Sequence, residues 1–298
     1  MTDPELVRTQ TFPLPGPLEL DIAVTLGRVE VKLDAEEPEA TVEIRHNPDA
    51  EQPWTQGISS LLSWVSERFG DQLGTDLNGT PADAVQQTRL EQTGNRLTVH
   101  APKALPLRNI PLAVTVIAPA GSAVEVRAGS ANVTVSGSAG RVDVSTGAGE
   151  IRLDRSEGAA TVRSGSGAIR LGPTLAGLHL RTGSGDVEVA SLSGSATLAT
   201  GTADVWLGTV SGSVLARSGS GDLSVAEAAS GNLELVTGSG DIRIGVRPGV
   251  AAEVDLTASA GKVSSELDVA LNRPDGEIPL NVRARTGSGT AMITRAAQ

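Results

Sequence analysis

The chain contains no cysteine and no tyrosine, and only three Trp and two Phe occur among its 298 residues. Without cysteine there is no disulfide framework, no thiolate metal site and no cysteine nucleophile. This composition fits a cytoplasmic protein, and we expect that localisation. A core without aromatic side chains must be filled by Val, Leu, Ile and Ala, which suit thin β-layers better than helical packing.

Positive charge is also scarce, because 24 Lys and Arg stand against 35 Asp and Glu and give a net charge of −11. Nucleic acids need a basic surface for their phosphates, so the charge argues against a nucleic-acid partner. It also disfavours electrostatic docking on anionic lipid. We expect neither a signal peptide nor a membrane span. The N-terminus has no basic region before an apolar run, and no segment approaches the roughly 18 apolar residues that a span requires.

Catalytic patterns are missing as well. The three histidines, His46, His100 and His179, form no His-x-x-x-His pair, and no nucleophile elbow, phosphate-binding loop or dinucleotide fingerprint occurs. Carbohydrate-cleaving β-helices usually have longer rungs and aromatic platforms for sugars, and this chain has neither. We therefore expect no enzyme, no catalytic residue and no cofactor.

Glycine, in contrast, is abundant with 35 residues, and much of it belongs to an internal repeat. A motif of the form [Ser/Thr]-Gly-Ser-Gly-Asp-Val-x-Val recurs at steps of 18 residues, and the seventh copy follows at a step of 19. These copies start at Ala128, Thr146, Ser164, Thr182, Thr200, Ser218 and Thr237. After insertions, two looser copies start at Ala258 and Thr286, which makes nine candidate rungs.

Apolar residues alternate inside each repeat and align from copy to copy. One column contains Val133, Ile151, Ile169, Val187, Val205, Leu223 and Ile242. Period-two alternation within this longer period predicts two short strands per rung and parallel pairing of successive rungs. An antiparallel sandwich would not keep one period so strictly. We predict an all-β chain with a parallel β-solenoid over residues 121–298, for which crossover chirality favours a right-handed winding.

The first 120 residues are less regular. Residues 18–45 indicate two or three strands, and residues 97–118 indicate two more. These strands are either degenerate early rungs or an N-terminal cap on the solenoid.

One insertion interrupts this region, and a second lies later in the chain. Residues 54–69 place apolar side chains, including Trp64 and Phe69, on one helical face, which predicts a short helix. This helix either covers the first rung or docks on a partner or a membrane. Residues 70–84 are rich in Gly, Asp and Thr and predict a mobile loop. A second loop insertion is expected at about 268–279.

The acidic position of the motif forms a column that includes Asp186, Asp204, Asp222 and Asp241. Like charges one rung apart repel, so we expect each carboxylate to accept backbone N–H bonds in its own turn. A calcium ladder is the alternative, and it makes these residues weak metal candidates. A second column precedes the motif and forms either ion pairs with the acidic column or an anion-binding stripe. It contains Arg127, Arg163, Arg181, Arg217 and Arg285.

Besides Trp64 and Phe69 of the expected helix, three residues are candidates for interactions. Trp206 occupies a position that holds Arg, Glu or Ser in other rungs, and the alternation points it outward. It is either covered by a loop such as 268–279 or marks an interaction surface. The C-terminal end of the solenoid has no candidate cap, and its last strand carries Ala291 and Ile293. Open ends expose unpaired strand edges, so this strand is a candidate for self-association.

The repeats, with the lead-in at residues 112–137, resemble a bacterial β-strand-repeat family of unknown function whose members are often described as adhesin-like. Related toastrack β-solenoid domains occur in envelope-stress proteins. The resemblance implies the fold and supplies no catalytic residues. We expect a non-enzymatic scaffold that associates with itself, as a dimer or polymer, through its terminal rungs. The alternatives are a module that binds a protein partner in envelope-stress signalling and a surface that binds metals or anions.

Overall fold

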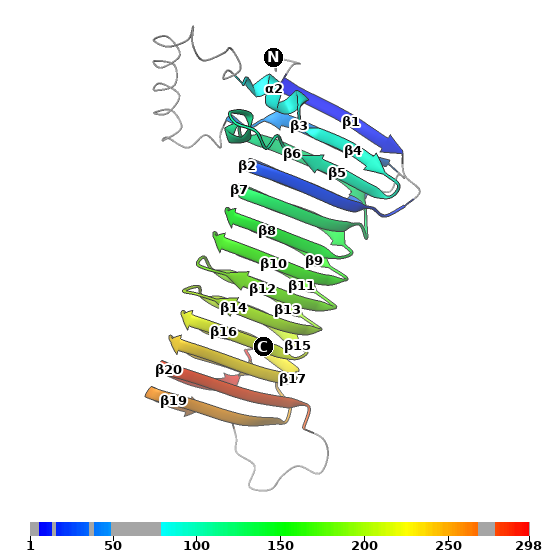
Figure 1. Ribbon diagram of the computed structural model, residues 1–298. Coiled ribbons are helices and arrows are strands. Elements are labelled where there is room, and N and C mark those ends of the chain that lie inside the picture. Colours follow the sequence, from blue (N-terminus) through cyan, green and yellow to red (C-terminus); the bar gives the residue numbers. More distant parts are fainter. Residues whose placement is uncertain (1–5, 14–15, 36–38, 49–78, 268–277, 298) are drawn as a thin grey trace, which may run out of the picture.

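The computed structural model describes residues 6–13, 16–35, 39–48, 79–267 and 278–297 (Figure 1). Its strands form one hydrogen-bonded sheet of 20 strands, and most neighbours along the repeat are parallel. Figure 1 shows the strands stacked along one axis, with the first strands at one end and the last strands at the other. The predicted all-β parallel solenoid is therefore confirmed; its handedness stays a prediction.

The repeat builds two layers, and each rung contributes one strand to each layer. In one layer β10 pairs in parallel with β8, so that Val162 lies beside Val144. In the other, β11 pairs with β9, and Ile169 lies beside Ile151. Partners are one 18-residue repeat apart, as predicted. The strands of this region are β7 (Ala123–Ala139), β8 (Val142–Ala148), β9 (Ile151–Ser156), β10 (Ala159–Ser166), β11 (Ile169–Thr174), β12 (Gly177–Thr182), β13 (Val187–Leu192), β14 (Ser195–Thr200), β15 (Val205–Ser211) and β16 (Val214–Ser220).

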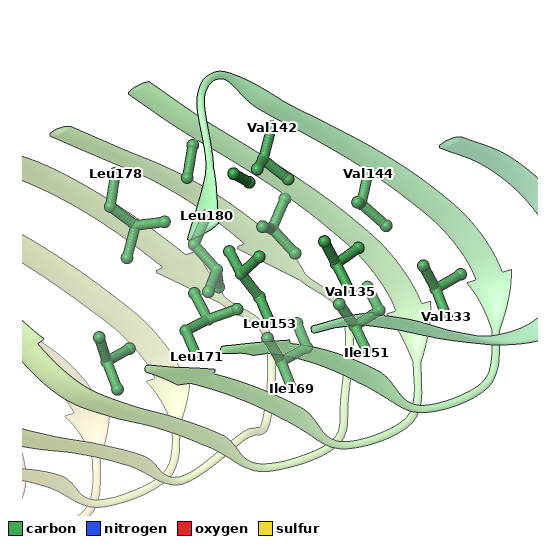
Figure 2. Close-up of a cluster of buried hydrophobic side chains, with 14 of the residues drawn as sticks. Val133, Val135, Val142, Val144, Ile151, Leu153, Ile169, Leu171, Leu178 and Leu180 are labelled. Atoms are coloured by element: carbon green, nitrogen blue, oxygen red, sulfur yellow. The ribbon is translucent and has the colours of Figure 1, made fainter. Parts of the chain in front are cut away.

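The core lies between the two layers and is almost entirely aliphatic. Figure 2 shows Val133, Ile151 and Ile169 of one layer facing Val144 and Leu180 of the other. Each of these side chains is at most 1% exposed. Burial of such apolar area, at about 25 cal/mol per Å², is the main favourable contribution to folding. The predicted inward columns are therefore the core.

The glycines of the motif lie at the corners where one layer passes into the other. Gly167 and Gly185 have φ angles of +112° and +99°, a region that L side chains rarely adopt. A β-carbon at Gly167 would lie 2.3 Å from the carbonyl oxygen of Gly149 in the preceding rung. The hydroxyl at the start of the motif closes the same corner, since Thr146 donates to the Ala148 carbonyl at 2.8 Å. Close stacking of the rungs therefore requires glycine here.

The N-terminal region contains both early rungs and a cap. Strand β2 lies beside β7 as a complete rung, with Leu20 beside Val124 and Val29 beside Val133. Strands β5 and β6 pair in parallel with the other edge of β2. Three antiparallel strands then cover this end, because β3 pairs with β6, β1 with β3 and β4 with β5. The strands are β1 (Val7–Pro13), β2 (Glu19–Ala35), β3 (Glu39–His46), β4 (Arg89–Thr93), β5 (Arg96–His100) and β6 (Leu112–Pro119).

A short helix, α2 (Pro81–Gln86), lies where the end of a mobile loop over residues 70–84 was expected, so that prediction is wrong for residues 81–84. Thr80 caps it: the Asp83 amide donates to the Thr80 hydroxyl at 3.2 Å, and the Thr80 amide donates to the Asp83 carboxylate at 2.9 Å. Val85 is fully buried, and the helix packs against β1 and β3. A 3₁₀ turn, η4 (Leu107–Asn109), lies beside it. No helix of the described residues is long and apolar enough to cross a membrane.

The predicted helix at residues 54–69, with Trp64 and Phe69, lies outside the described residues, and so does most of the expected loop at 268–279. Their predictions therefore stay untested.

At the C-terminal end the order of the strands in space differs from their order in the sequence. The last strand, β20, lies between β17/β18 and β19, so β19 is the terminal rung. Ala291 lies between Ile242 on one side and Val263 on the other. The strands are β17 (Leu223–Ser239), β18 (Ile242–Val246), β19 (Ala252–Ser265) and β20 (Leu280–Arg295).

The prediction that Ala291 and Ile293 form an open end is therefore wrong, since both are fully buried. The reason is that the last two copies preserve the repeat motif to different degrees. The copy at Thr286 keeps the Thr-Gly-Ser-Gly corner, and its hydroxyl donates to the Gly240 carbonyl at 2.9 Å. The copy at Ala258 has alanine in place of the threonine and therefore lacks that hydroxyl. Along the first half of β19, half-exposed side chains alternate with exposed ones. The more complete repeat occupies the interior position.

A charged cluster fastens the N-terminal rungs to the repeat. Asp21 of β2 has a side chain only 10% exposed, and Arg96 of β5 donates to it at 2.7 Å. His100 of β5 lies 3.1 Å and Arg127 of β7 lies 3.6 Å from the same carboxylate. Burial alone would raise the pKa of Asp21, but the hydrogen bonds and positive charge of His100 and Arg96 outweigh it and lower the pKa. The carboxylate thus joins three rungs.

We expect Asp21→Asn to lower the free energy of unfolding at pH 7 by about 1.5–3 kcal/mol, the usual contribution of a hydrogen bond to a charged group. Because the folded state lowers the pKa of Asp21, the stabilisation is present above roughly pH 4 and is lost as the pH falls through the folded value. Urea unfolding of both proteins from pH 7 to pH 3 measures this. Asp143→Asn, which removes an exposed carboxylate of β8, is the control, and an equal loss in both variants would contradict the role of Asp21.

Candidate binding groove on the outer face

A groove of about 530 Å³ crosses the outer face of the layer that contains β11, β13 and β15, and it extends onto β17 and β18. It follows one outward column, to which each of five rungs contributes one side chain. Alternation along the strands turns these residues away from the core, as it does in the predicted pattern. The column contains Arg170, Glu188, Trp206, Ser224 and Arg243.

Trp206 lies in the middle of this column. Its neighbours in register are Glu188 on β13 and Ser224 on β17. The side chain points outward, as predicted, and the residue is 44% exposed within the described structure. A β-carbon at Gly208 would lie 3.3 Å from the Cη2 atom of the indole, so the ring lies along its own strand over that glycine. The smallest residue beside Trp206 thus lets the ring lie close to the sheet.

The rung of Trp206 also departs from the repeat at its corner. Ala203 replaces the glycine that has a positive φ angle in the neighbouring rungs, such as Gly185 and Gly221. No non-glycine residue has a positive φ angle in the part of the chain that the structure describes. This corner therefore follows a different path, and Ala203 is buried.

Two arginines flank the tryptophan, each two rungs away, and carboxylates already engage both. Arg243 lies 3.0 Å from Asp222 and 2.6 Å from Asp241. Arg170 forms an ion pair with Glu150 and a longer one, of 3.7 Å, with Glu188. The guanidinium groups are therefore held against the wall of the groove.

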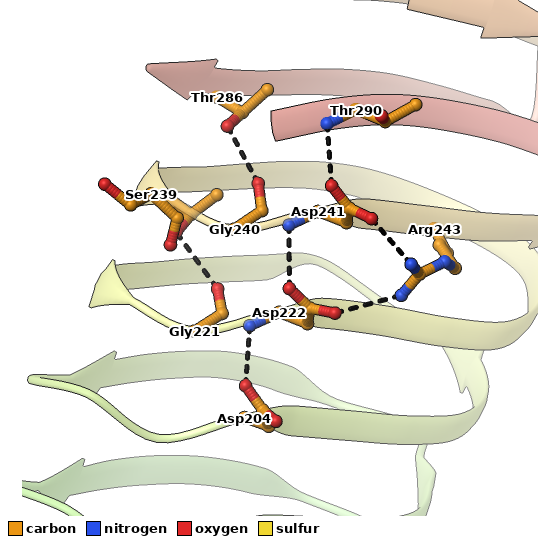
Figure 3. Close-up of polar contacts among 10 residues, drawn as sticks. Asp204, Gly221, Asp222, Ser239, Gly240, Asp241, Arg243, Thr286 and Thr290 are labelled. Carbon is orange, nitrogen blue, oxygen red and sulfur yellow. Dashed lines mark hydrogen bonds and ion pairs between the residues drawn. The ribbon is translucent and has the colours of Figure 1, made fainter. Parts of the chain in front are cut away.

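The acidic column forms the rim of the groove, and its carboxylates bond between rungs (Figure 3). The Asp222 amide donates to Asp204, and the Asp241 amide donates to Asp222, each at 2.8 Å. The Thr290 amide continues the ladder by donating to Asp241 at 2.8 Å. The expectation that each carboxylate bonds within its own turn is therefore wrong for Asp204, Asp222 and Asp241, which accept an amide of the next rung. Asp186 makes no such bond among the described residues.

These bonds also bear on the metal hypothesis. The Asp241 amide lowers the pKa of Asp222, and Arg243 lowers it further, while burial works in the opposite direction. Within the described ranges, no group of three or more His, Cys, Asp or Glu is arranged to hold a metal ion. The lone pairs of Asp204, Asp222 and Asp241 that a cation would need are partly occupied by amides.

The arginine column lies on the outer face of the other layer. Arg163 lies 3.5 Å from Asp143, and Arg217 lies 3.6 Å from Glu234. Their partners are outward carboxylates of the same layer, which differs from the predicted pairing with the acidic column of the motif. The pairing differs because the arginine column and the acidic column lie on different sides of a corner of the rung.

The sequence predicted Trp206 and the acidic rim but missed Glu188, Arg170 and Arg243 as members of one groove. A signal was present, because all three occupy the column of Trp206 at steps of one repeat.

A family model described as Toastrack DUF4097 matches residues 77–277, more than half of the chain, and confirms the predicted resemblance. Among curated proteins, none matches. Similar solved structures include a "putative adhesin" from Bacteroides fragilis, with 13% identity, a TM-score of 0.41 and 96% of each chain covered. Another "putative adhesin", from Parabacteroides merdae, has 12% identity and a TM-score of 0.46, with 97% of this chain and 96% of that chain covered. These likenesses carry no functional argument.

The ladder predicts a difference between two neighbouring acids. Asp222→Ala should lower the free energy of unfolding by about 1 kcal/mol and speed hydrogen exchange at the Asp241 amide, because that amide loses its acceptor. Asp222→Asn keeps an acceptor oxygen and should leave the exchange rate almost unchanged. Asp186→Ala is the matched control in the same column. Equal effects of Asp186→Ala and Asp222→Ala on stability and exchange would contradict the ladder.

Proposed function

The chain belongs to the toastrack family DUF4097, and from this premise we propose that it is a non-enzymatic interaction protein that binds a partner in the groove around Trp206. The observation that carries the proposal is one large apolar side chain, 44% exposed, at the centre of a groove lined by charged residues. Partially exposed Trp within a polar surround is the composition of binding hot spots.

The remaining surface supports this choice. The inward columns form the core, and on the layer that contains β8 and β10, Arg163 and Arg217 already pair with outward carboxylates. Around Trp206, by contrast, the chain departs from its own repeat in two places, the ring itself and Ala203. A fold needs neither departure, since the rungs on both sides stack without them. A binding role accounts for an exposed ring that the solenoid does not require.

A library of random dodecapeptides displayed on phage and selected on the immobilised protein tests the groove. We expect the enriched peptides to bind at least about tenfold more weakly to Trp206→Ser, the loss expected for a central hot-spot residue. Leu175→Ser is the matched control, because Leu175 is 36% exposed and lies at a corner outside the groove lining. Peptides that bind Trp206→Ser as tightly as the wild type, or a selection that enriches none, would refute the proposal.

A second candidate is self-association at the C-terminal end, and a specific observation favours it. Among the described strands, β19 pairs only with β20, so its other edge presents backbone N–H and C=O groups without a strand partner. Val263, which continues the core column of Ala291, is 51% exposed. A second copy of the chain that adds its own β19 at this edge would pair these groups. The surface differs from the one first predicted, since it belongs to β19 and not to β20.

Light-scattering mass over a wide concentration range tests this candidate. We expect the wild-type mass to rise with concentration, and Val263→Asp to remain a folded monomer because a charge at the exposed edge prevents pairing. Ala291→Asp, one rung inward in the same column, should instead unfold the chain, with a cost of roughly 3 kcal/mol or more for a buried charge. A wild-type protein that stays monomeric at every concentration would exclude the second candidate.

A further inference from the structure

We infer that the groove recognises the guanidinium group of an arginine side chain, carried by an extended segment of the partner, with the guanidinium stacked on Trp206. The inference rests on the proposed function and adds the chemistry of the ligand to it. Three features of the groove support it: its excess of carboxylates, the placement of the indole ring and its length.

The lining contains four carboxylates, on Asp186, Glu188, Asp204 and Asp222, and two guanidinium groups. Both guanidinium groups are engaged, since Arg243 pairs with Asp222 and Asp241, and Arg170 pairs with Glu150 and Glu188. Asp186 and Asp204 form no ion pair within the described structure. An anionic ligand would meet these carboxylates and be repelled, whereas a cation would gain a partner.

The ring of Trp206 is the second feature of the groove that favours a cation. An aromatic face attracts a cation through its electron density, and Trp is the most effective side chain for this. Glu188 stands beside Trp206 in register on β13, and its side chain is 57% exposed. A planar guanidinium can lie on the ring and donate to a carboxylate at its edge at the same time, which a spherical ammonium does less well. The chemistry therefore favours arginine over lysine.

The length of the groove indicates a ligand larger than one side chain. Its lining extends over five rungs, from Arg170 to Arg243. Four steps of about 4.8 Å give a length of roughly 19 Å. An extended peptide spans this distance with about six residues. One arginine would occupy the centre at Trp206, and the flanking residues of the segment would cover the ends.

Two variants remove charge from the groove without removing structure. Glu188→Gln changes a side chain whose one ion pair within the described structure is the long contact to Arg170. Asp204→Asn keeps the oxygen that accepts the Asp222 amide. The chain itself shows that asparagine serves in this role, because Asn132 accepts the Glu150 amide at 2.9 Å in the same way. Asp143→Asn removes one negative charge from the other layer and is the control for net charge.

The test uses four probes of about equal length, titrated into the wild-type protein and the variants by calorimetry at low and high salt. They are an acetylated hexapeptide with a central arginine among Gly and Ser, its lysine and citrulline counterparts, and a neutral oligosaccharide. Citrulline has the shape of arginine without its charge. We expect the arginine peptide to bind at least about tenfold more tightly than the citrulline peptide, and to weaken with salt.

In the variants, Trp206→Ser and the double change Glu188→Gln with Asp204→Asn should each weaken the arginine peptide about tenfold, while Asp143→Asn has no effect. Equal binding of the citrulline peptide, or of the lysine peptide, overturns the inference. If binding of the oligosaccharide depends on Trp206 and the arginine peptide does not bind, the groove remains a binding site, but the inference that it recognises a guanidinium group is wrong. If no probe and no selected peptide depends on Trp206, the proposed function itself fails.

Discussion

The structure depends on one constraint, which is that each rung must lie directly on the next, close enough for parallel backbone hydrogen bonds at about 4.8 Å. At the corners that carry a glycine with a positive φ angle, this distance leaves no space for a β-carbon, and a side chain at Gly167 would collide with the carbonyl of Gly149. Between the layers it places the inward residues of successive rungs directly beside one another. Val133 and Ile151, for example, are such neighbours and are almost completely buried.

The constraint leaves the outward positions free, and the chemistry of the molecule is concentrated there. Residues one repeat apart in the sequence become neighbours on the surface, so a column of unrelated side chains forms a continuous strip. The acidic rim is the more regular strip, because Asp222 and Asp241 each bond an amide and thereby help to hold the rungs together. In the strip of Trp206, Arg170 and Arg243 form ion pairs with neighbouring rungs, whereas Trp206 itself makes no such contact among the described residues. The tryptophan is therefore evidence about a ligand, whereas the acidic rim is first evidence about stability.

The interior of the solenoid could be predicted from the sequence because its neighbours in space are successive repeats, so periodicity identifies the contacts. The ends could not, since there the neighbours are not successive. Strand β7 follows β6 in the sequence, yet β2 lies between them. Strand β20 likewise separates β18 from β19. The sequence did contain two signals that could have corrected these predictions. The hydroxyl of Thr286 marks the more complete of the last two copies, but the order of the copies in the sequence outweighed it. Thr80 and Asp83 form a capping box, but the loop-like composition around them outweighed it. In the groove, Trp206 was predictable from alternation, whereas the ion pairs of Arg170 and Arg243 required side-chain geometry.

The two candidate interaction surfaces differ in the specificity that they can provide. An open edge such as β19 is recognised mainly through backbone groups, which every extended chain carries, so it distinguishes partners poorly unless side chains add to it. Lys262 on this edge is a charge of the kind that natural edge strands use to discourage unselective pairing. The groove offers the opposite balance, because an indole ring, several carboxylates and paired guanidinium groups would select a ligand by charge and shape. Nothing in the stacking of the rungs requires this combination at the column of Trp206. If the chain binds a partner as proposed, specific recognition would therefore belong to the side of the solenoid, even if its end also contributed to assembly.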